Sequence, residues 1–138
     1  MTKKTLLLLL VALFTSANAW ELFPPDDTKL KVVDRDYKAV YRQNKEQHYY
    51  AVLYNGADQS YLDVYVGLPW KRLHRWAVDF EGEKVKVRPR AALKISYDEE
   101  GDKLHIYWND YAGYAEAAVH LVLIYDPKSG KFTTQWSD

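Results

Sequence analysis

The stretch KLHIYW at positions 103–108 decides the fold, because apolar and polar side chains alternate along it. Successive side chains of a β-strand point to opposite faces, so Leu104, Ile106 and Trp108 would share one face. The stretch EKVKVR at positions 83–88 alternates in the same way. Both segments are therefore predicted to be strands with one buried and one solvated face.

The rest of the chain has a similar composition, with 12 Tyr and 5 Trp among its 138 residues, and this favours strands over helices. Turn residues such as Asn55-Gly56 separate the apolar segments at the spacing of an antiparallel meander. We expect an all-β protein, either a single antiparallel β-sandwich or a partly closed β-barrel of about eight strands. The predicted strands cover positions 30–33, 48–54, 61–66, 71–80, 83–88, 92–97, 103–108, 117–125 and 131–136.

Two segments are interpreted individually. Positions 117–125 are apolar on both faces except for His120, which predicts a strand in the middle of a sheet. Positions 42–47 are polar and are expected to form a loop or one helical turn.

The first 19 residues have the three-part layout of a secretory signal peptide. Lys3 and Lys4 precede an apolar run at positions 6–14, and the small residues at positions 17–19 precede Trp20. The run is shorter than the roughly 20 residues that cross a bilayer, so no transmembrane segment is expected. We expect an exported protein, periplasmic or secreted, with a cleaved signal peptide at 1–19, an N-terminal linker at 20–28 and one β domain at 29–138.

The charges are unevenly distributed along the chain. Without Lys3 and Lys4, 17 Lys and Arg residues face 19 Asp and Glu residues, which gives no reason to expect nucleic acid as a partner. Positions 70–94 carry eight basic and three acidic residues, whereas positions 95–126 carry seven acidic residues and one Lys. The two segments would either pair across neighbouring strands or present a charged face to a partner.

The sequence gives little support for catalysis or metal binding. The four His residues lack the spacing of a zinc or copper site, and no cofactor is expected. The acidic turn at positions 98–102 departs from the calcium-loop pattern, so an acidic hairpin turn is the preferred interpretation. No Cys is present and no Ser lies in a G-x-S-x-G motif. We expect a non-enzymatic protein, although a small glycan hydrolase built on paired carboxylates stays open.

Aromatic residues mark two candidate binding sites. The first is the loop between the strands predicted at 103–108 and 117–125, because loops on rigid sheets commonly carry function. The same loop would alternatively fold back as a lid over the sheet edge. The second is an aromatic platform on alternate residues of one strand. The candidate residues are Tyr111, Gly113, Tyr114 and Glu116 in the loop, and Trp70, Arg72, His74 and Trp76 in the platform. Core positions are the preferred interpretation for Trp76, Trp108 and Trp136.

Positions 97–136 resemble the C-terminal half of the bacterial periplasmic lysozyme inhibitors, especially the i-type inhibitor group. The resemblance comprises the acidic turn at 98–102, the next strand, the loop with Ala112-Gly113-Tyr114, a long strand and the turn at 126–130. In that family a Ser-Gly…Tyr loop enters the active cleft of the enzyme. Because Ala112 stands where a Ser is expected, the resemblance extends only to Gly113 and Tyr114. Immunity proteins against wall-degrading effectors look similar at this level.

These observations favour an exported, non-catalytic binding protein of the cell envelope. Its partner would be a protein, such as a cell-wall-degrading hydrolase that it inhibits or to which it gives immunity. The alternative is a carbohydrate-binding module that uses exposed Trp and Tyr side chains.

Overall fold

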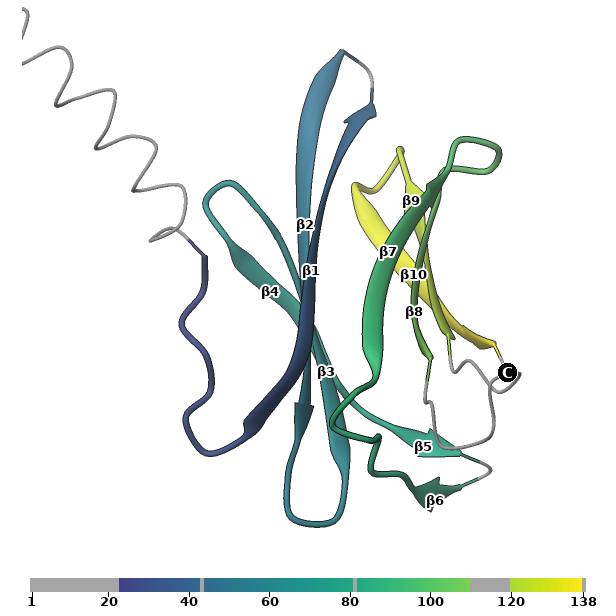
Figure 1. Ribbon diagram of the computed structural model, residues 1–138. Coiled ribbons are helices and arrows are strands. Elements are labelled where there is room, and N and C mark those ends of the chain that lie inside the picture. The colour runs from purple at the N-terminus through teal and green to yellow at the C-terminus, as the bar shows by residue number, and fades with distance from the viewer. Residues whose placement is uncertain (1–22, 43, 81, 110–119, 138) are drawn as a thin grey trace, which may run out of the picture.

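The computed structural model describes residues 23–42, 44–80, 82–109 and 120–137, and every regular element within them is a β-strand (Figure 1). Two four-stranded antiparallel sheets face each other, which confirms the predicted all-β sandwich. The first sheet has the order β1 (Lys31–Arg42), β2 (Lys45–Asn55), β3 (Ser60–Gly67) and β4 (Lys71–Ala77). The second has the order β10 (Lys131–Ser137), β9 (His120–Asp126), β8 (Lys103–Asn109) and β7 (Ala92–Asp98).

A short hairpin of β5 (Asp79–Phe80) and β6 (Glu83–Lys84) connects the two sheets. The sequence predicts single strands over 71–80 and 83–88, and both predictions are too long. Val78 leaves the ladder and is fully buried, and its N–H donates to the carbonyl of Ser60. Val87 also lies outside the strands, and its N–H donates to Ser60 Oγ. The hydrogen bonds to Ser60 thus replace a regular ladder in this connection.

The first hairpin is longer than predicted. Its first strand extends to Arg42 rather than ending at position 33, and its second strand starts at Lys45. The loop or helical turn expected at positions 42–47 is therefore wrong. Asn44 adopts a φ of 61° in the tight turn, a left-handed conformation that Asn tolerates better than most residues. The strand prediction at 117–125 lies partly outside the described residues, but β9 is a central strand, as expected.

The core lies between the sheets and comes from both. Leu53 and Leu62 of the first sheet and Ile106 and Leu121 of the second are fully buried. Each such side chain contributes about 1.5–3 kcal/mol relative to an exposed one. Trp108 is 1% exposed, which confirms the prediction that it is a core residue. Trp76 is partly buried against the same core, whereas 40% of Trp136 is exposed.

Two carboxylates close one side of the sandwich, where β1 lies beside β7. Asp34 accepts the backbone N–H of Leu93 at 2.8 Å, and Asp36 accepts that of Ile95 at 2.8 Å. These N–H groups belong to the edge strand of the second sheet, which would otherwise offer them to another chain. Side chains of the first sheet therefore cover the edge of the second.

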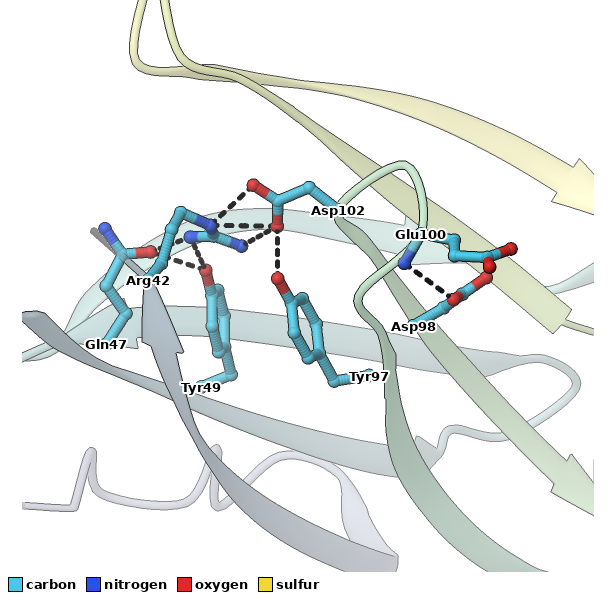
Figure 2. A network of polar contacts seen from close by, with 7 residues as sticks. All are labelled: Arg42, Gln47, Tyr49, Tyr97, Asp98, Glu100 and Asp102. Carbon is cyan, nitrogen blue, oxygen red and sulfur yellow. Dashed lines mark hydrogen bonds and ion pairs between the residues drawn. The ribbon is translucent and has the colours of Figure 1, made fainter. Parts of the chain in front are cut away.

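A polar network centred on Arg42 also joins the sheets (Figure 2). Its guanidinium pairs with Asp102 from the β7–β8 turn, with Nη2 and Oδ1 2.6 Å apart, and it lies over the ring of Tyr125 at 4.2 Å. Burial works to lower the pKa of Arg42, but hydrogen bonds to Asp102 and Tyr49 outweigh burial, and the pKa rises above its ordinary value. Arg42 also contacts Gln47. At this end of the sandwich, the ion pair of Arg42 and Asp102 joins the two sheets, and protein side chains supply the hydrogen bonds that water would otherwise make to it.

No helix in the described residues is long and apolar enough to cross a membrane.

Candidate functional site

The first predicted site, the loop with Tyr111, Gly113, Tyr114 and Glu116, lies outside the described residues. Its two anchors are described, because β8 ends at Asn109 and β9 begins at His120.

The second predicted site, the platform, does not occupy one face of its strand. The ladder between β3 and β4 shifts by one residue, so that His74 lies opposite Val64 whereas Arg72 lies opposite Tyr65. Leu73 is the extra residue of a β-bulge, and a bulge reverses the alternation of side chains. The prediction that Trp70, Arg72, His74 and Trp76 share a face is therefore wrong.

The two tryptophans of the platform consequently lie on opposite faces of the first sheet. Trp76 packs against the core between the sheets and lies 4.8 Å from the ring of His74. Trp70 packs against a second cluster, which includes Tyr50 and Val52, on the outer face. Of the two tryptophans, only Trp70 can therefore belong to a binding surface on the outer face.

Trp70 is the centre of an aromatic cluster on this outer face. Its ring stacks on Phe23 with the centroids 5.6 Å apart and meets Tyr50 at 5.8 Å. Tyr37 and His48 meet the same ring edge-on at 6.1 and 6.4 Å. We call these five residues the outer aromatic patch.

A glycine allows the central ring to lie where it does. A Cβ added to Gly67 would lie 2.7 Å from a ring carbon of Trp70, closer than Cβ atoms approach other heavy atoms. Trp70 therefore lies directly against the backbone at the end of β3, a close approach that only glycine permits.

The chain before β1 lies across the same outer face rather than hanging free. Asp27, which falls in the predicted linker, donates its backbone N–H to the hydroxyl of Tyr54 at 3.1 Å. Its carboxylate pairs with Arg75 at 3.1 Å. Arg75 in turn forms two hydrogen bonds with the fully buried Asp63, at 2.6 and 2.8 Å, and this contact holds the pKa of Arg75 above its ordinary value. The segment is thereby fixed to the sheet.

Beside the segment that precedes β1 lies a hollow of about 420 Å³, within the size range of small-molecule sites. Arg35 projects one guanidinium nitrogen to Tyr50 Oη at 3.2 Å and another to Asp26 at 3.0 Å. Tyr37 at its rim is 42% exposed. The residues lining the hollow are Phe23, Arg35, Asp36, Tyr37 and Tyr50.

The hollow combines apolar ring faces with the guanidinium of Arg35, which pairs with the carboxylate of Asp26. The carboxylate of Asp36 points to the other sheet, where it accepts the N–H of Ile95. Burial raises the pKa of Tyr50, so its hydroxyl keeps its proton and can act as both donor and acceptor. Arg35 offers only donors, and the carboxylate of Asp26, which pairs with Arg35, offers only acceptors. A ligand with an apolar ring face and several hydroxyl groups would match this arrangement.

The acidic turn is held by protein groups. Asp98 accepts the backbone N–H of Glu100 at 3.0 Å, and Asp102 points the other way, toward Arg42 (Figure 2). Within the described residues, no group of three or more His, Cys, Asp or Glu side chains could hold a metal ion.

The basic and acidic segments do not pair with each other among the described residues. Arg72 and Arg75 pair with Asp63, and Lys84 pairs with Asp58, all outside positions 95–126. The expectation of mutual pairing fails because β4 lies in the first sheet, whereas positions 95–126 build most of the second. The basic segment therefore keeps most of its charge toward solvent.

Comparison of the chain with protein-family models, with curated proteins and with solved structures finds no match. Its function is therefore inferred from the geometry described above.

Proposed function

We propose that this protein is an exported, non-catalytic binding protein of the cell envelope whose outer aromatic patch holds a glycan chain. The hollow beside Arg35 carries the proposal, because three aromatic rings line it beside the ion pair of Arg35, which only donates hydrogen bonds, and Asp26, which only accepts them. Sugars present an apolar face of C–H groups and a rim of hydroxyls. The aromatic rings can stack on the apolar face of a sugar, and the pair of Arg35 and Asp26 can form hydrogen bonds with its hydroxyl groups.

The balance of charge favours an uncharged sugar. Arg35 already pairs with Asp26. A strongly anionic ligand would have to displace this carboxylate or accept its repulsion. Neutral hydroxyls can instead join the existing hydrogen bonds.

The direct test is a titration of the mature chain with N-acetylglucosamine hexamers, monitored by tryptophan fluorescence and by calorimetry. The ring of Trp70 contacts Tyr37 and Phe23, so a bound sugar should change its emission. Tyr37→Ala should weaken binding about tenfold, because a stacked ring contributes about 1–1.5 kcal/mol.

Tyr41→Ala is the matched control, since Tyr41 lies on the same strand and is 73% exposed. Equal losses in both variants, or no heat and no spectral change with the wild-type protein, would reject the proposal.

Inhibition of a cell-wall hydrolase is a second candidate function. It is favoured by the anchoring of the loop with Tyr114, because β8 and β9 pair up to Tyr107 and His120 immediately beside it. Loops that join the strands of a rigid sheet commonly carry function. A turbidity assay of lysozyme on cell walls, with wild type and Tyr114→Ala compared, tests this function independently of sugar binding.

A further inference from the structure

A groove lies on the side of the sandwich where β4 and β10 run beside each other. Trp76 and Trp136 meet there with their ring centroids 6.4 Å apart, at the far ends of the two strands. Near the starts of the same strands a cavity of about 470 Å³ opens between the sheets. Its lining residues are Val66, Lys71, Arg72, Leu73, Gly130, Lys131 and Phe132.

The floor of this groove is apolar. Phe132 packs inward on Tyr49 and Tyr125, with ring centroids 6.0 and 5.4 Å apart, so its position is fixed. Leu73 is 37% exposed because it is the extra residue of the β-bulge. Together with the half-buried Val66, these side chains leave apolar surface facing the cavity.

The rim of the groove is basic. Lys71 and Lys131 are exposed, and no Asp or Glu lines the cavity among the described residues. Arg72 lies 3.7 Å from Asp63, whereas Arg75 holds that carboxylate at 2.6 Å. The guanidinium of Arg72 therefore lies toward the outer face, and the positive charge of the rim comes from Lys71 and Lys131.

We propose that this groove binds a small amphiphilic anion from solution, with a hydrocarbon or aromatic body and a carboxylate or phosphate head. The body lies on Leu73 and Phe132, and the head lies between Lys71 and Lys131. An inorganic ion would leave the apolar floor uncovered, and a neutral hydrocarbon would leave the basic rim without a counter-charge. This site goes beyond the proposed glycan function, since it lies on another side of the molecule and shares no lining residue with the hollow.

A monomeric ligand fits the shape better than the two macromolecular occupants. An extended acidic peptide would have to pair with the edge of β4, and the bulge and basic side chains of that edge oppose strand addition. A membrane surface needs a projecting apolar element, whereas this site is concave. The experiment below distinguishes the proposed ligand from an acidic peptide and from a membrane surface.

The experiment measures binding of dodecyl phosphate, kept below its micellar concentration, by calorimetry, with octaethylene glycol monododecyl ether as the neutral, sugar-free counterpart. We expect binding of the phosphate alone, weakened by added salt. Lys71→Gln combined with Lys131→Gln should reduce the affinity about tenfold, since both charge-assisted hydrogen bonds to the head are lost and solvent weakens such bonds at exposed side chains. Leu73→Ser should weaken binding with no change in its salt dependence.

The matched control is Lys31→Gln combined with Lys94→Gln, which removes two exposed positive charges outside the groove. Equal weakening by both double variants would overturn the proposal, because it would show attraction to net charge alone. Equal binding of the neutral ether would overturn the anionic specificity. Binding to phosphatidylglycerol vesicles or to polyglutamate without binding of monomeric dodecyl phosphate would replace the proposed ligand with a membrane or an acidic polypeptide.

Discussion

Arg42 and Asp102 are 60 positions apart in the chain, yet Nε of Arg42 lies 2.8 and 2.7 Å from the two carboxylate oxygens of Asp102. Only 6% of the Arg42 side chain is exposed, against 28% of the Asp102 side chain. The first residue ends the long strand of one sheet and the second lies in a turn of the other. The pair therefore fixes the position of one sheet on the other.

Asp102→Asn should lower the free energy of unfolding by about 2–3 kcal/mol, because it leaves a buried guanidinium without its counter-charge. Asp102 has a φ of 53°, a conformation that Asn also accepts, so the substitution tests charge without adding backbone strain. Asp102→Ala should cost about 1 kcal/mol more. Urea denaturation measures both. Asp98→Asn, in the same turn, is the control and should change stability by less than about 0.5 kcal/mol.

The carboxylates that cover the edge of β7 give a second prediction. Replacing both Asp34 and Asp36 with Ala should destabilise the protein by about 1–3 kcal/mol per site, since each change leaves a partly buried N–H without an acceptor. The exposed edge should also promote self-association, visible in sedimentation velocity. The double Asn variant keeps an acceptor at each site and should stay monomeric. Association of the Asn variant to the same extent would point to charge rather than to edge protection.

Gly67→Ala should displace the ring of Trp70, because the new Cβ would lie 2.7 Å from that ring. We expect a changed near-ultraviolet circular dichroism spectrum, a loss of about 1–3 kcal/mol in stability from overpacking and weaker glycan binding. Leu68→Ala is the control, since Leu68 is the next residue and is 52% exposed. An unchanged tryptophan spectrum in Gly67→Ala would contradict the expected displacement of Trp70.

Three strands of the second sheet could be predicted from the sequence, because apolar and polar side chains alternate along β7 and β8 and turn residues precede β10. Positions 92–97, 103–108 and 131–136 each lie within the observed strands β7, β8 and β10. The first strand could not be predicted at its full length, because its inward positions include Asp34 and Asp36. In the sequence, these carboxylates suggest a solvated loop. They lie on the inner side because they accept the backbone N–H groups at the edge of the other sheet.

The candidate site was only partly predictable for a related reason. Trp70 was identified from the sequence, but its partners Phe23, Tyr37 and Tyr50 come from other segments that the fold brings together. The bulge at Leu73 has no glycine or other local signal, so alternation alone assigned Trp76 to the same face. The spacing of aromatic residues thus identified Trp70 but not the outer aromatic patch to which it belongs.

High pH should unfold the protein steeply, because burial raises the pKa of Tyr49, Tyr50 and Tyr54 above the ordinary value of a phenol. A pKa that is higher in the folded state gives a stability that is complete below the pKa of the unfolded chain, about 10, and that is lost as the pH rises toward the folded value. If all three ionise only on unfolding, the free energy of unfolding should fall by about 4 kcal/mol per pH unit above that point.

Absorbance of phenolate at 295 nm, recorded together with circular dichroism, measures this coupling. The buried tyrosines should ionise only as the sheet signal disappears. Tyr54→Phe, which keeps the ring but removes one ionisable hydroxyl, should reduce the slope by about one third, that is by one proton. Immediate ionisation of every tyrosine with the sheet signal intact would contradict the burial of these hydroxyls and, with it, the packing of the outer face on which the glycan proposal depends.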